Sequence, residues 1–202
     1  IGAENTESRK NILRLAQEMG YVPNQAAINL KKSRSYVIGL YFSTISKMTS
    51  PFVLHDVLTG VYSVAGSKYN VVVKGIDMHE SGTLNPSYFD GIIVLSQRSE
   101  DMEFMNEVLD KKIPMSVICR AVDVDAPNVT TDEALAMERA MDYLLENGHR
   151  NIGIIEGNPG LDSSRLRRRG WRTSMTSHGL DPDALPVISG NYRYASGYTA
   201  AK

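Results

Sequence analysis

The sequence has a single cysteine and no long hydrophobic run. Because Cys119 is the only cysteine among 202 residues, an internal disulfide is excluded and a reducing compartment is expected. No apolar run approaches the roughly 20 residues that span a bilayer, and no charged-then-apolar leader precedes the first amphipathic segment. We therefore expect a cytoplasmic protein with no membrane partner.

The common catalytic motifs are also missing. There is no G-x-S-x-G elbow, no H-E-x-x-H, no Walker A loop and no G-x-G-x-x-G after the first expected strand. Four scattered histidines and one cysteine do not supply the ligand spacing of a zinc site. The sequence thus predicts no enzyme, no metal and no cofactor. One alternative stays open: the loop GNPGLDSSR (157–165) could bind a phosphate at a helix N-terminus, although such loops join many strands to helices.

The net charge of −1 is unevenly distributed. Residues 1–36 carry a net +3, which leaves −4 for the remainder; the basic side chains are Arg9, Lys10, Arg14, Lys31, Lys32 and Arg34. A basic arm on an acidic body is typical of nucleic-acid binding, but +3 is also common on an ordinary solvated surface. Charge alone therefore favours an ordinary solvated surface over a nucleic-acid-binding one.

The N-terminal region predicts two helices. From Asn5 to Met19, apolar residues recur at helical spacing, and Gly20 follows as a stop, so we expect an amphipathic helix that needs a partner. Pro23 suits the first turn of a second, short helix reaching Lys32. In this predicted helix, aliphatic side chains stand next to a run of basic ones. Residues 33–36 are predicted to form a polar connector.

Downstream, apolar runs alternate with helical segments. The expected strands are 37–42, 70–76, 91–96, 115–119 and 151–157, and the expected helices are 52–67, 101–112, 133–147 and 163–178. This order predicts a doubly wound α/β sheet. Such sheets bind ligands beyond the carboxyl ends of their strands, so function is expected in the loops at 43–51, 96–100, 119–121 and 157–164. The connection at 77–90 lacks the usual crossover helix, which leaves a short crossover or missing residues as alternatives.

Five arginines lie on the last predicted helix. Four of them, Arg165, Arg168, Arg169 and Arg172, share one flank, whereas Arg167 points away from it toward Trp171 and Met175. Arg167 is therefore expected to face inward or into the ligand crevice. A polyhydroxylated or carboxylate ligand and a structural salt bridge to an aspartate explain it equally well.

The order of these features resembles the LacI/GalR family of transcriptional regulators over essentially the whole chain. The matching stretches are ESRKNILRLAQEMGYVPNQAAINLKKSRSYVIGL, SPF (50–52), DGIIVLS, IPMSVICR, YLLENGHRNIGIIEG, SSRLRRRGW and SGYTAAK. The resemblance implies four parts: the tail of a helix-turn-helix domain (1–22), a hinge helix and linker (23–35), an effector-binding N-subdomain (36–128) and the start of a C-subdomain (129–202). The implied fold is a periplasmic-binding-protein-like doubly wound parallel sheet with two subdomains, the second incomplete, which indicates a chain truncated at both ends.

The resemblance also implies roles for individual residues. In the family, a hinge leucine wedges between base pairs in the minor groove of a palindromic operator; Leu30 matches it, and Asn24, Ala27 and Lys31 match neighbouring DNA-binding positions. The implied effector-binding residues are Ser50, Phe52, Arg120, Ser163 and Arg167. Aromatic stacking with arginine donors suits a sugar or a similar polyol. Cys119 stands where the family commonly has an aspartate.

Together these features predict a homodimeric, ligand-controlled repressor whose effector shifts the population between two subdomain poses. Two alternatives remain. A solute-binding protein of the same fold would lack DNA binding, and a phosphate-handling α/β enzyme would use the loop at 157–165.

Overall fold

The computed structural model describes residues 6–20, 34–45 and 49–202. The chain divides into two compact units, Ile1–Ser35 and Tyr36–Lys202. In the first unit, helix α1 (Thr6–Glu18) confirms the predicted amphipathic helix, and Gly20 follows with a positive φ of 67°. Its apolar residues Ile12 and Leu15 are exposed within this unit. The expected second helix, with Asn24, Ala27, Leu30 and Lys31, lies outside the described residues.

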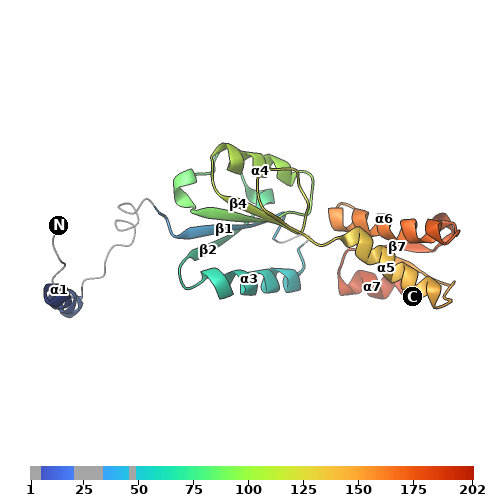
Figure 1. Cartoon of the computed structure of the whole chain (residues 1–202), viewed down its shortest axis with the longest axis horizontal. Helices are drawn as coiled ribbons and strands as arrows, with labels where there is room; N and C mark the ends of the chain where they lie inside the picture. Colours follow the sequence, from blue (N-terminus) through green and yellow to red (C-terminus); the bar gives the residue numbers. More distant parts are fainter. Residues whose placement is uncertain (1–5, 21–33, 46–48) are drawn as a thin grey trace. The chain divides into compact units, whose positions relative to one another are not determined.

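The second unit contains a five-stranded parallel sheet (Figure 1). The strands are β1 (Val37–Phe42), β2 (Asn70–Gly75), β3 (Gly91–Leu95), β4 (Met115–Ile118) and β5 (Asn128–Val129), in the order β2-β1-β3-β4-β5. Helix α3 (Pro51–Ala65) covers one face, where Leu40, Phe42 and Leu95 form an apolar cluster. Helix α4 (Asp101–Asp110) covers the other face, where the larger cluster includes Tyr41 and Phe104. Burial on both faces explains the continuous apolar runs of the sequence.

The connection from β2 to β3 is a short crossover without an α-helix. It consists of two 3₁₀ turns, η1 (Ile76–Met78) and η2 (Pro86–Tyr88), joined by extended chain. The Glu107 carboxylate of α4 accepts hydrogen bonds from the backbone N–H groups of Gly82 and Leu84, each at 3.0 Å. These contacts attach the crossover to helix α4.

The C-terminal part forms a second, smaller parallel sheet of two strands, β6 (Ile154–Glu156) and β7 (Val187–Ser189). Its helices are α5 (Glu133–Glu146), α6 (Asp162–Ser177) and α7 (Tyr194–Ala200). Helices α5 and α6 pack closely at Gly170, where an added Cβ would lie 2.1 Å from the Ala134 carbonyl oxygen. Trp171 and Met141 are buried beside this contact.

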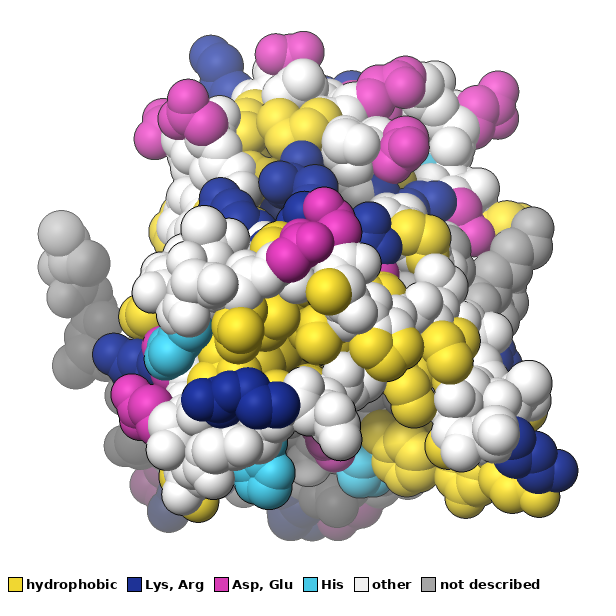
Figure 2. All heavy atoms as spheres, turned by 90° about the vertical axis from the view of Figure 1, so that its right-hand side faces the viewer, with side chains coloured by type: hydrophobic (Ala, Val, Ile, Leu, Met, Phe, Trp, Pro, Cys, Tyr) yellow, Lys and Arg dark blue, Asp and Glu magenta, His cyan; other side chains and the backbone are white. Residues whose placement is uncertain are grey.

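Figure 2 views the end of this unit that carries α5, α6, β7 and α7, and hydrophobic side chains are visible at its surface. Exposed apolar residues of this region are Tyr143, Ile155, Val187, Ile188, Tyr194 and Tyr198. Among the described residues, no helix is both long enough and apolar enough to cross a bilayer.

Most predicted elements are confirmed, with two differences. The strand expected at 151–157 is only three residues long, because the flanking Asn151 and Gly153 are exposed outside the ladder. Strands β5 and β7 and helix α7 were not predicted. Both strands are two or three residues long and exposed, so they lack an apolar run that sequence could reveal.

Candidate ligand-binding site

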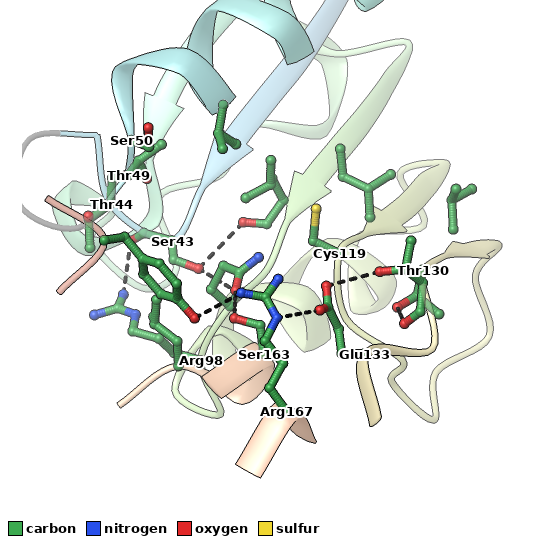
Figure 3. Close-up of a pocket in the computed structure, with 18 residues that line it drawn as sticks. Ser43, Thr44, Thr49, Ser50, Arg98, Cys119, Thr130, Glu133, Ser163 and Arg167 are labelled. Carbon is green, nitrogen blue, oxygen red and sulfur yellow. Dashed lines mark hydrogen bonds and ion pairs between the residues drawn. The ribbon is translucent and has the colours of Figure 1, made fainter. Parts of the chain in front are cut away.

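A cavity of about 700 Å³ lies where the carboxyl ends of β1, β3, β4 and β5 face the N-terminus of α6 (Figure 3). Its lining comes from residues 43–44, 49–50, 53, 95, 97–98, 118–119, 129–131, 133, 161, 163 and 167, together with Tyr192. All four loops at which the sequence places ligand binding contribute to it. The location follows the rule that parallel α/β sheets present their crevice at the carboxyl edge.

Asp101 organises one wall of the cavity from behind. Its side chain is fully buried and accepts hydrogen bonds from the hydroxyl groups of Ser43 and Ser96. It also accepts from the backbone N–H groups of Gln97 and Arg98, each at 3.2 Å. A buried carboxylate with this many donors is well compensated, so it fixes the ends of β1 and β3 relative to each other.

Gln97 connects this wall to helix α6. Its backbone carbonyl oxygen accepts from the N–H of Asp162 at 3.0 Å, and its side-chain oxygen accepts from the Ser163 hydroxyl at 3.3 Å. Ser163 therefore lies at the cavity, as Figure 3 shows. The loop after β3 and the N-terminus of α6 thus share direct hydrogen bonds at this point.

Arg120 does not line the cavity, contrary to the expectation. Its Nε forms an ion pair with the Asp162 carboxylate, and its Nη1 donates to the Arg98 carbonyl oxygen at 2.7 Å. The structure instead gives Arg98 a place in the lining, where Nη2 donates to the Ser43 carbonyl oxygen at 2.9 Å. Arg120 thus supports the lining residues and does not itself face the cavity.

Phe52 also lies outside the lining. Its side chain is 79% exposed at the start of α3, whereas its neighbours Ser50 and Val53 line the cavity. A one-residue step along a helix rotates the side chain by about 100°, which is enough to turn Phe52 away from the wall that Val53 faces.

Arg167 points into the cavity and is also paired. Its Nε donates to the Glu133 carboxylate at 2.6 Å, and its Nη1 donates to the Tyr192 hydroxyl at 3.2 Å (Figure 3). The hydrogen bond to Glu133 raises the pKa of the Arg167 guanidinium, so its charge is permanent. The structural salt bridge is therefore present, with a glutamate as partner instead of an aspartate, and ligand binding by Arg167 stays a prediction.

Cys119 lines the cavity at the end of β4 with a positive φ of 70°. Burial raises the pKa of its thiol, the charge of Glu133 raises it further, and a hydrogen bond with Gln97 opposes both. The side chain at this position is therefore a neutral thiol at physiological pH.

The loop at 157–165 offers few free donors to a phosphate. The N–H of Gly160 donates to the Asn158 side chain, and the N–H of Leu161 donates to the Asn158 carbonyl oxygen. The N–H of Asp162 is bonded to Gln97. The loop geometry therefore does not support the phosphate alternative.

Across residues 6–20, 34–45 and 49–202, no three His, Cys, Asp or Glu side chains gather as metal ligands.

Sequence reasoning missed Glu133 and Tyr192. Glu133 opens a helix that was predicted, where a glutamate is already explained by the helix dipole. Tyr192 precedes a helix that was not predicted, and it reaches the cavity because Gly157 has no side chain: a Cβ there would meet the Tyr192 ring at 1.9 Å. Neither position carries a signal that sequence alone could show.

Comparison with known proteins agrees with this fold and site. The family model of the periplasmic binding protein-like domain matches residues 141–202. The "Probable HTH-type transcriptional repressor ExuR" of Bacillus subtilis is 32% identical over 195 residues, which cover 96% of the chain and 59% of that protein. "Catabolite control protein A" of Priestia megaterium is 26% identical over 207 residues, 96% of the chain and 60% of that protein.

Two solved structures share the fold. The complex of the transcriptional regulator CelR with cellobiose has a TM-score of 0.67 at 24% identity, over 96% of the chain and 60% of that protein. The lac repressor dimer bound to operator and an anti-inducer has a TM-score of 0.76 at 18% identity, over 98% of the chain and 61% of that protein. The chain spans about 60% of the length of the curated relatives above. By its motif order, its fold and these relatives, the chain belongs to the LacI family.

Proposed function

We propose that this protein is a ligand-responsive, sequence-specific DNA-binding transcriptional regulator, acting as a repressor, whose effector is a sugar or sugar derivative. The observation that carries the proposal is the cavity at the carboxyl edge of the sheet, in a chain whose relatives are named as transcriptional repressors and regulators. One structural relative, CelR, was solved with cellobiose. The proposed role is binding and not catalysis.

The cavity chemistry suits a polyhydroxylated ligand. Hydroxyl side chains line it on several sides, and Arg98 and Arg167 add guanidinium donors. These groups match the alternating donors and acceptors of a sugar ring, and a cavity of about 700 Å³ can hold a mono- or disaccharide. Among the residues that the resemblance implies, Ser50, Ser163 and Arg167 are the proposed effector contacts.

We propose the same four-part division that the resemblance implies: 1–22, 23–35, 36–128 and 129–202. The hinge residues Asn24, Ala27, Leu30 and Lys31 would bind a palindromic operator in a homodimer. An effector that prefers one pose of the two subdomains would shift the population of that pose, and with it the spacing of the two hinge helices. Operator DNA as the proposed partner implies a cytoplasmic location.

The test is a fluorescence-anisotropy titration of the intact protein on a palindromic DNA library, with and without a panel of sugars. We expect salt-sensitive binding to a selected palindrome that one sugar modulates. Arg167→Ala should abolish the sugar response at retained DNA affinity, because it removes a guanidinium from the cavity wall. Arg169→Ala on the same helix, outside the cavity, is the matched control. Tight sugar binding without any DNA preference would contradict the proposal and favour a solute-binding protein.

A further inference from the structure

The charges that line the cavity are internally paired. Arg98 lies 3.3 Å from the buried Asp101 carboxylate, and Arg167 lies 2.6 Å from Glu133. Among the described residues that line the cavity, Glu133 alone presents a carboxylate, since Asp101 is fully buried behind Arg98. Glu133 therefore decides which charge a ligand meets beside Arg167.

Glu133 is held at this place from two sides. One carboxylate oxygen accepts from Arg167 Nε, and the other accepts from the Thr131 hydroxyl at 3.0 Å. The residue also lies in the first turn of α5, where the helix dipole favours a negative charge. Its side chain is 21% exposed, so the carboxylate is accessible from the cavity but mostly withdrawn from bulk water. Figure 3 shows the Glu133 and Arg167 side chains pointing toward each other at the cavity wall.

This arrangement has a consequence for ligand charge. A carboxylate or phosphate that approaches Arg167 also approaches Glu133, in surroundings where like charges repel more strongly than in water. The bound anion must either displace Glu133 from its two hydrogen-bond donors or remain close to the Glu133 carboxylate, where the two negative charges repel each other. A hydroxyl group faces neither cost, because it can donate to Glu133 and accept from the guanidinium.

We propose that Glu133 is a specificity-determining residue that selects uncharged polyhydroxylated ligands and disfavours their carboxylated or phosphorylated counterparts. This inference rests on the proposed sugar-binding function and goes beyond it by naming the charge class of the ligand. The hydroxyl side chains of Ser43, Ser50 and Thr130 in the same cavity are compatible with an uncharged ligand.

The test is isothermal titration of the intact protein with matched sugar pairs: glucose and glucuronate, galactose and galacturonate, and glucose and glucose 6-phosphate, with cellobiose as a larger neutral probe. Wild-type protein should bind a neutral member at least about tenfold more tightly than its anionic counterpart. Glu133→Gln keeps an oxygen acceptor for Arg167 and should shift that ratio by at least about tenfold toward the anion. Glu146→Gln, the same change at the far, exposed end of α5, should leave the ratio unchanged.

Three outcomes would overturn the inference. Wild-type protein that binds the anion as tightly as the neutral sugar contradicts it without any variant, so the test does not depend on the folding of Glu133→Gln. An equal loss of affinity for both members in Glu133→Gln would show a purely structural role. If no sugar of either class binds, the proposed sugar response fails and this inference fails with it.

Discussion

Glu107 shows how one side chain can replace a packed helix. Burial alone would raise the pKa of its carboxyl group, but hydrogen bonds from His79, Gly82, Lys111 and Leu84 lower that pKa to about 2. The ordinary value is 4.5, so the folded protein binds the proton less well than the unfolded chain. The stabilisation is therefore complete above pH 4.5 and is lost as the pH falls from there toward 2.

We expect Glu107→Gln to lower the free energy of unfolding at pH 7 by about 2 kcal/mol, because the backbone N–H groups of Gly82 and Leu84 lose a charged acceptor. Urea titrations followed by circular dichroism at several pH values measure the effect. The difference from wild type should shrink between pH 4.5 and 2. Glu103→Gln, on the exposed side of the same helix, is the control. A difference that stays constant with pH would show that the carboxylate charge is not responsible.

Single-residue roles were only partly readable from the sequence. Ser50, Ser163 and Arg167 line the cavity, as the resemblance implied, and for Arg167 its position on the helix had already indicated the direction. Arg120 and Phe52 do not line it, since the resemblance identifies a position but not the rotamer or partner that a long side chain adopts. The buried hydrogen-bond network of Asp101 depends on contacts between loops that no local pattern records.

At the scale of elements, the contact between α5 and α6 depends on one glycine. Gly170→Ala would place a methyl group 2.1 Å from the Ala134 carbonyl oxygen, and that neighbour is backbone, which cannot rotate away. We expect a loss of about 1–3 kcal/mol in the free energy of unfolding. The fluorescence of Trp171, the only tryptophan, reports unfolding at the same contact.

Gly60→Ala provides the control for this prediction, because Gly60 lies inside α3 and an added Cβ there meets no atom within 4 Å. Alanine favours a helix, so this variant should be more stable by about 0.5–1 kcal/mol. If both variants gave the same change, close helix packing at Gly170 would be refuted.

Long elements with clear periodicity were predictable, and short ones were not. The bounds of α3, α4, α5 and α6 differ from the predicted ones by no more than two residues, since each carries an apolar stripe and most end near glycine or a turn. The short strands β5 and β7 exist because neighbouring strands offer them hydrogen-bond partners. That cause lies in tertiary structure and not in local sequence.

At the scale of the whole molecule, the proposed coupling joins a DNA-binding hinge to the ligand cavity. Leu30→Ala in the intact protein should weaken operator binding by at least about tenfold, because an apolar wedge that unstacks a base step is lost. Anisotropy on operator DNA measures this effect, and calorimetric sugar titration should give an unchanged affinity. Reduced sugar affinity with normal DNA binding would contradict the hinge assignment.

The fold class followed from the alternating pattern, the family from motif order and the edge of the sheet that carries the cavity from the strand ends, but the full lining of the cavity did not. It combines Ser43, Cys119, Glu133 and Tyr192, which are spread over 150 residues of chain. Only the arrangement of the two sheets brings them together, so the charge pairing within the cavity was beyond sequence reasoning.

The hydrogen bond from the Asp162 amide to the Gln97 carbonyl oxygen bridges the two sheets at the cavity. An amide proton exchanges with deuterium from the solvent only after its hydrogen bond opens. The exchange rate at Asp162 therefore reports how often this contact between the loop after β3 and the N-terminus of α6 opens. That exchange rate measures an opening motion of the kind on which a regulatory response would depend.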